Sequence, residues 1–133
     1  MINSNAFAYV DLLTASANYS WKRNEVISSN IANVDTPGYK RQDVSFESVL
    51  SAAVAKGSST SQSLTKVVSE INYDHVRPTI YTDNSNLSYR IDKNNVDIDT
   101  EQIELASNQL YYQGVIDSMS QEFSRMKTAM TTS

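Results

Sequence analysis

The residues best suited to chemistry are the single histidine and a run of acidic side chains late in the chain. His75 follows Asp74, a pair that could belong to a hydrolytic triad, but no serine nucleophile can be assigned to it from the sequence. The chain has no cysteine, which excludes a thiol nucleophile, a disulfide framework and a thiolate metal site. We therefore expect no catalytic site, and we interpret His75 as an exposed loop residue.

The acidic run over residues 92–104 has some features of a calcium-binding loop. It departs from that pattern where the pattern is strictest. Val96 stands at a ligand position, Asp97 replaces the required glycine, and Ile103 replaces the bidentate glutamate. The sequence also has no glycine-rich phosphate loop. We expect neither a metal nor a cofactor, and no small-molecule substrate.

Charge and composition also argue against nucleic acid as a partner. The chain has 133 residues, which is the length of one domain, and a formal net charge of −4. Its eight tyrosines could stack on bases, but there is no basic groove to hold a phosphate backbone. The acidic excess lies in residues 96–133, where six acids face only Arg125 and Lys127.

Helical periodicity dominates both ends of the chain. Over residues 4–34, apolar or small residues recur at alternating steps of four and three, and Ser20 and Asn24 interrupt the series. Over residues 99–131 the same steps continue without a slip, with Asp99 as the expected N-cap and Gln102 as its capping-box partner. We expect the packing and assembly contacts at these positions: Val10, Leu13, Ile27, Ile31, Leu105, Tyr112, Ile116, Met119, Phe123 and Met126.

The segment between these helices has weaker signals. Residues 57–65 form a flexible polar run, residues 46–55 could form a short helix, and residues 67–91 are compatible with short strands. We expect a mainly α protein whose long N- and C-terminal helices pair as an antiparallel coiled coil. A variable, loop-rich middle would hold a short helix or a hairpin. The expected division is residues 1–34, 35–98 and 99–133, and the weakly apolar middle implies that neighbouring chains complete the core.

The first helix should stop abruptly. Proline disfavours helix at Thr36, and Pro37-Gly38 suits the centre of a type II turn. Asn33 is a plausible terminal residue because asparagine tolerates positive φ. By itself this pattern predicts only a helix stop.

The residues around this stop resemble the N-terminal signature of flagellar rod and hook axial proteins, which is roughly N-x-A-N-x-x-T-x-G-Y. Asn30, Ala32, Asn33, Thr36, Gly38 and Tyr39 match it one by one. The continuation through Lys40, Val44-Ser45-Phe46-Glu47 and Leu50 is similar to the FlgB family of proximal-rod proteins. The stretch 95–101, with Asn108, Leu110, Tyr112 and Gln113, is similar to the C-terminal helix of that family. The resemblance covers both ends, about half of the chain.

This resemblance implies a structural subunit of the proximal rod that polymerises through its terminal helices and links the membrane-embedded base to the more distal rod. The implied partners are other copies of the chain, the rod protein FlgC, the rod-base adaptor FliE, and the MS ring or export gate. The implied elbow motif comprises Asn30, Ala32, Asn33, Thr36, Pro37, Gly38 and Tyr39, and it would present Tyr39 and Lys40 to a neighbouring subunit.

Localisation depends on whether the resemblance holds. The sequence has no apolar run long enough to cross a bilayer and no cleavable secretory signal, which alone favours the cytoplasm. The resemblance instead implies export without a cleaved signal to the basal body, outside the cytoplasmic membrane. Two alternatives stay open: another axial protein such as FlgC or a distal-rod subunit, or a cytoplasmic coiled-coil adaptor or export chaperone.

Overall fold

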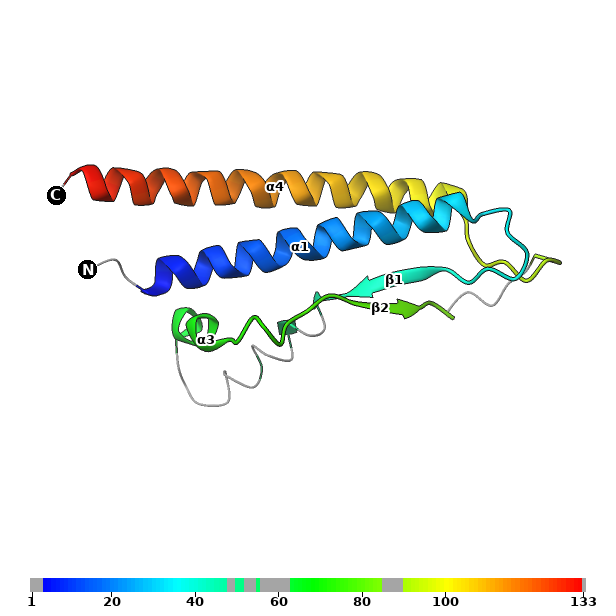
Figure 1. The fold of residues 1–133 in the computed structure, drawn as a ribbon, viewed down its shortest axis with the longest axis horizontal. Coiled ribbons are helices and arrows are strands. Elements are labelled where there is room, and N and C mark those ends of the chain that lie inside the picture. The colour runs from blue at the N-terminus through cyan, green and yellow to red at the C-terminus, as the bar shows by residue number, and fades with distance from the viewer. Residues whose placement is uncertain (1–3, 48–49, 52–54, 56–62, 85–89, 133) are drawn as a thin grey trace.

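The protein is built around two long antiparallel helices. A computed structural model describes residues 4–47, 50, 51, 55, 63–84 and 90–132. Helix α1 (Ser4–Ala32) lies between helix α4 (Ile98–Thr131) on one side and a thinner layer on the other (Figure 1). That layer contains strand β1 (Gln42–Ser45), helix α3 (Leu64–Glu70) and strand β2 (Thr79–Thr82). The expected mainly α fold with paired terminal helices is confirmed.

Helix α1 is buried on two faces because it is the middle layer. Leu13, Ser20 and Ile27 are buried at seven-residue spacing, and Ser20 hydrogen-bonds to α4, so this stripe faces α4. Tyr19 and Val26 are buried on the opposite side, against the thin layer. Because both sides of α1 are buried, its apolar residues do not all lie on a single heptad stripe.

The thin layer supplies the main apolar cluster of the molecule. Val44, Phe46 and Val76 pack with Tyr19 and Val26 of α1, and the rings of Tyr19 and Phe46 stack with centroids 5.0 Å apart. The middle segment therefore forms this cluster together with α1. Its few apolar residues are far apart in sequence, and only the fold brings them together over α1.

The two strands form a small antiparallel sheet in which Asp43 is opposite Tyr81 and Val44 is opposite Ile80. The expected strands over residues 67–91 are confirmed only at β2, because residues 64–70 are helical. The partner strand β1 lies directly after the turn, where no alternation of apolar and polar residues marks it. Of the expected short helix over residues 46–55, Phe46 is not helical, the described positions 47, 50, 51 and 55 are helical, and the others lie outside the described residues. The polar run lies outside them too, apart from Ser63 and the first residues of α3.

The helix ends differ from expectation in their caps. Helix α4 begins at Ile98 with Asp97 as N-cap, whose carboxylate accepts hydrogen bonds from the backbone N–H groups of Asp99 and Thr100. The expected cap at Asp99 was wrong by two residues. Asn33 does not adopt a positive φ; Lys93 is the one non-glycine residue in the described part of the chain that does. The helix instead ends through ordinary turns, with the Asn33 N–H bonded to the carbonyls of Ser29 and Asn30.

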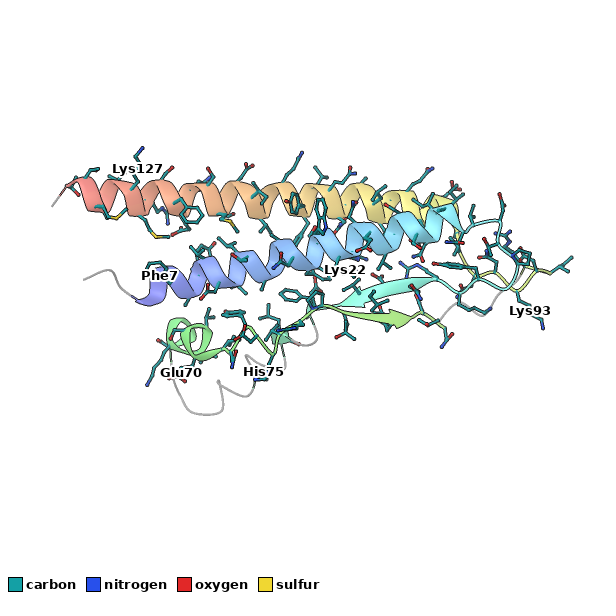
Figure 2. The ribbon with its side chains drawn as sticks, in the orientation of Figure 1. Phe7, Lys22, Glu70, His75, Lys93 and Lys127 are labelled. Carbon is teal, nitrogen blue, oxygen red and sulfur yellow. The ribbon has the colours of Figure 1, made fainter. Side chains whose placement is uncertain are left out.

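The turn after α1 has the expected type II features. Gly38 has a φ of 72°, and the N–H of Tyr39 donates to the carbonyl of Thr36 over 3.2 Å. The Gly38 N–H donates to the carbonyl of Asp92 over 2.7 Å, which ties the turn to the loop that leads into α4. Figure 2 shows Lys93 of that loop at the far end of the molecule from Phe7.

Candidate functional site

The two segments that carry the sequence motifs meet in space. We call their meeting point the motif junction, and define it as Asn30, Tyr39, Arg41, Asp43, Asn94, Asn95 and Glu101. It joins the end of α1, the start of β1 and the start of α4. Residues separated by up to 71 positions in the chain are directly hydrogen-bonded there.

Asn30 is the hub of the junction and is fully buried. Its Nδ2 donates to the carbonyl of Gln42 over 2.7 Å and to Oε2 of Glu101 over 3.0 Å. Its Oδ1 accepts from the Gln42 N–H over 3.0 Å and from the Tyr39 hydroxyl over 3.2 Å. One amide therefore pairs with both backbone groups at the edge of β1, as a neighbouring strand would, and also holds α4.

Asn94 closes the end of α1 and is also fully buried. Its Nδ2 lies 2.9 Å from each of three carbonyl oxygens, those of Asn33, Val34 and Thr36. Its Oδ1 accepts from the N–H of Val96 over 2.8 Å. The carbonyls of the turn that follows α1 are thus held by a side chain from the loop that leads into α4.

Two arginines make the junction ionic. Arg41 contacts Glu101, Asp83 and Asp43, and Arg23 of α1 contacts both Asp43 and Glu104. Burial acts to lower the pKa of Arg41, but its hydrogen bonds and charge contacts with Glu101 and Asp43 outweigh burial, so its pKa is raised. Each arginine is thus paired with carboxylates from other segments of the chain, so the network suits the fastening of α1 and β1 to α4.

The pKa of Asp43 is shifted in the opposite direction to that of Arg41. Burial acts to raise the pKa of its carboxyl group. The hydrogen bonds from Arg23 and from the Val44 N–H, together with the charges of Arg23 and Arg41, outweigh burial and lower the pKa. Asp43 is therefore held as an ionised partner of both arginines.

The elbow residues lie in three different settings. Asn30 is buried in the junction, and Tyr39 is half-buried with its hydroxyl on Asn30. Asn33 bonds within the helix end to Ser29. The remaining members are exposed: Ala32, Thr36, Pro37 and Gly38. The Lys40 amine donates to the carbonyl of Lys93, so the polar ends of both Tyr39 and Lys40 have partners within this chain.

The expected packing positions divide into two groups. Leu13 and Ile27 are buried, and six more are half-buried: Val10, Ile31, Leu105, Tyr112, Met119 and Met126. Ile116 and Phe123 are exposed. The buried residues of α4 are instead Glu101, Asn108 and Val115, so the buried stripe of α4 is rotated away from the positions that the apolar pattern predicts.

A second polar contact lies midway along the helix pair. The Ser20 hydroxyl donates to Oδ1 of Asn108 over 3.0 Å, and Nδ2 of Asn108 donates to the Ser20 carbonyl over 2.9 Å. Sequence reasoning missed Asn108, Glu101, Asn94 and Arg41 as contact residues because polar side chains do not count toward an apolar seam. The interruption at Ser20 was the one usable signal, since a polar gap in one seam indicates a polar partner in the other.

The residues weighed for chemistry are not gathered into a site. His75 is exposed on the middle segment, on the side away from the helix pair (Figure 2). Within the described ranges, no group of three or more His, Cys, Asp or Glu side chains is placed to hold a metal ion. No helix in that part of the chain is both long and apolar enough to cross a membrane.

Comparisons with known proteins agree on one family. A family model described as "Flagella basal body rod protein" matches residues 22–40, from the second half of α1 through the turn. The flagellar basal body rod protein FlgB of Bacillus subtilis (strain 168) is 36% identical over 115 residues, which are 82% of this chain and 82% of the relative. FlgB of Borrelia hermsii is 36% identical over 80% of this chain and 78% of its own length. FlgB of Escherichia coli (strain K12) is 31% identical over 82% of this chain and 83% of its own length.

Proposed function

The chain belongs to the FlgB family of flagellar basal body rod proteins, and from this membership we propose that it polymerises through its terminal helices in the proximal rod. It is a structural subunit of the basal body rod, supports flagellar motility, and interacts with other rod and basal body components. The relatives favour neither another axial protein such as FlgC nor a cytoplasmic adaptor or export chaperone. We assign the chain no catalytic activity.

The observation that carries the proposal is the uncovered flank of α4. Ile116, Phe123 and Met130 follow one another at seven-residue spacing and are 39%, 54% and 60% exposed. Beyond Val115 no described residue of α4 is buried, although the helix continues to Thr131. An apolar stripe left open along half of a long helix is typical of a surface that a neighbouring helix covers.

The motif junction supports the same role from the other side. It fastens the two terminal helices at one end by buried hydrogen bonds and ion pairs. The helix pair can therefore act as one stiff unit while its open apolar flank contacts neighbours. We further propose that the neighbours are other copies of the chain, FlgC, FliE and the MS ring or export gate, and that the chain is exported without a cleaved signal peptide.

The first test is mass spectrometry of purified, detergent-washed basal bodies from the source organism. A few copies of the chain in each basal body, alongside the other rod proteins, are expected. Intact basal bodies that lack the chain would overturn the assignment.

The second test is the substitution Ile116→Asp. Because Ile116 is already exposed, the isolated chain should fold normally, whereas assembly would bury an unpaired charge at a cost of about 3–5 kcal/mol. We expect secretion at the wild-type level but loss of incorporation and swimming. Gln121→Asp, at another exposed position of α4, is the matched control and should assemble. Normal swimming of the Ile116→Asp strain would show that this stripe is not the assembly surface.

A further inference from the structure

Helix α4 has a second apolar surface, on the side away from α1. Ile103 and Leu110 are 69% and 71% exposed, and each follows by two positions a buried residue, Glu101 or Asn108, that hydrogen-bonds to α1. Two positions are about 200° around a helix, so both side chains point away from α1, where α4 is the outermost layer (Figure 1). We call this exposed surface the outer face and define it by five residues: Ile103, Ala106, Leu110, Gly114 and Asp117.

The outer face lacks the charges that helices usually carry on the side that faces water. From residue 105 to residue 121, Asp117 is the only charged side chain. Gly114 also has no role within the described structure, because a glycine lowers the stability of a helix interior and nothing lies within 4 Å of the Cβ that another residue would add. Exposed aliphatic side chains, few charges and a glycine together suit the close approach of another helix.

The apolar flank of a second copy is complementary to the outer face in charge. Lys127 is exposed one turn after Phe123 of that flank, and Asp117 is exposed at the end of the outer face. Neither Lys127 nor Asp117 forms an ion pair with another described residue. They lie about 15 Å apart along one helix, which is too far for a pair within the chain. A parallel second copy shifted by that distance brings its Lys127 level with Asp117.

The same shift also fits the apolar residues. Ile116 of the second copy lies between Ile103 and Leu110, which have the same seven-residue spacing as Ile116 and Phe123. Phe123 of the second copy lies opposite Gly114, where the absent side chain leaves room for the ring. One register therefore places both apolar side chains in gaps of the facing helix and also pairs the two charges.

We propose that the outer face of α4 receives the apolar flank of a second copy of this chain. The inference rests on the proposed function, since it says which two surfaces of α4 meet when the subunit polymerises. These surfaces lie about 120–140° apart around the helix, so each copy contacts one neighbour on each side. Contacts between two different surfaces build rings or helical filaments rather than closed pairs. Gln121→Asp is compatible with this contact, because the new acid lies one turn beyond Asp117 and close to Lys127 of the second copy.

The first test uses the absence of cysteine from the chain. In the double variant Asp117→Cys with Lys127→Cys, mild oxidation of purified basal bodies should link copies of the chain into dimers, trimers and larger species on a non-reducing gel. Asp117→Cys with Arg125→Cys is the matched control and should give no such ladder. Arg125 has a 73% exposed side chain but lies about 200° around α4 from Lys127. Dimers alone would show a two-fold contact, and an absence of links would show that another partner covers the outer face; either result would overturn the proposal.

The second test exchanges the two charges. Asp117→Lys and Lys127→Asp each bring like charges together, so each should lower incorporation into basal bodies by about tenfold. The double variant restores opposite charges and should be incorporated within about twofold of the wild-type level. Both positions are exposed, so equal melting temperatures of the purified variants are the control for folding. A double variant as poorly incorporated as the single variants would contradict the pairing, whereas wild-type chain missing from basal bodies would refute the proposed function itself.

Discussion

Asn94→Asp changes one atom of the buried side chain that closes α1. In the native protein its Nδ2 lies 2.9 Å from three carbonyl oxygens. The substitution replaces that donor with an oxygen, so the shape is kept while three attractive contacts become repulsive. The protein can relieve the repulsion by keeping the new carboxyl group protonated.

The free-energy cost of that protonation sets how much stability the variant should lose. Holding a carboxyl group of ordinary pKa about 3.9 protonated at pH 7 costs about 1.36 kcal/mol per unit over about three units, or about 4 kcal/mol. This is a large part of a typical unfolding free energy of about 5–15 kcal/mol. For a chain of this size the melting temperature should fall by about 12–24 °C.

The pH dependence has a definite sign. The pKa of the introduced carboxyl group is raised in the folded state, so the loss of stability is complete above that folded pKa and shrinks as the pH falls toward about 3.9. At pH 4 only the lost hydrogen bonds should remain, about 1–2 kcal/mol. Urea unfolding of wild type and variant, followed by circular dichroism at pH 7 and pH 4, measures both differences.

Asn95→Asp is the matched control. Asn95 is also buried, but among the described residues its Nδ2 donates to one carbonyl, that of Asp83, and its Oδ1 already accepts from the Arg41 N–H. We expect it to cost about 1–2 kcal/mol at pH 7. Equal losses for the two variants, or a loss in Asn94→Asp that does not shrink in acid, would refute the capping argument.

Three further predictions concern other contacts. Gly38→Val should cost about 1–3 kcal/mol in thermal unfolding, from the positive φ alone, since no atom lies within 4 Å of the new Cβ; Gly38→Asn should cost less. The lowered pKa of the Asp43 carboxyl group stabilises the fold at pH values above the ordinary pKa of 3.8. This stabilisation should be lost as the pH falls through the pKa that Asp43 has in the folded state. The loss should be measurably smaller in Arg23→Gln. Asn108→Leu should cost about 1–3 kcal/mol in urea unfolding, because the Ser20 hydroxyl keeps only its 3.3 Å hydrogen bond to the backbone carbonyl of residue 108 and the Ser20 carbonyl loses its donor. The added change Ser20→Ala should restore part of this loss, and no restoration would contradict the pairing.

The sequence predicted what depends on neighbours along the chain. The two long helices follow from apolar spacing over about 30 residues each, and the turn follows from a proline and a glycine whose backbone preferences are local. The rod-family resemblance came from two short motifs, and the relatives confirm it. None of these inferences required knowledge of which surfaces meet.

The tertiary structure decided which surfaces meet. Leu13 and Ile27 lie in the predicted seam of α1, but the contact stripe of α4 passes through Glu101 and Asn108, which an apolar pattern cannot select. Burial of a polar residue is favourable only when its hydrogen-bond partner is present, and the partner of Glu101 on α1 is 71 positions away. The sequence therefore determined the helices, the turn and the family, while long-range polar pairing determined the phase of the helix contact and left one apolar flank of α4 open.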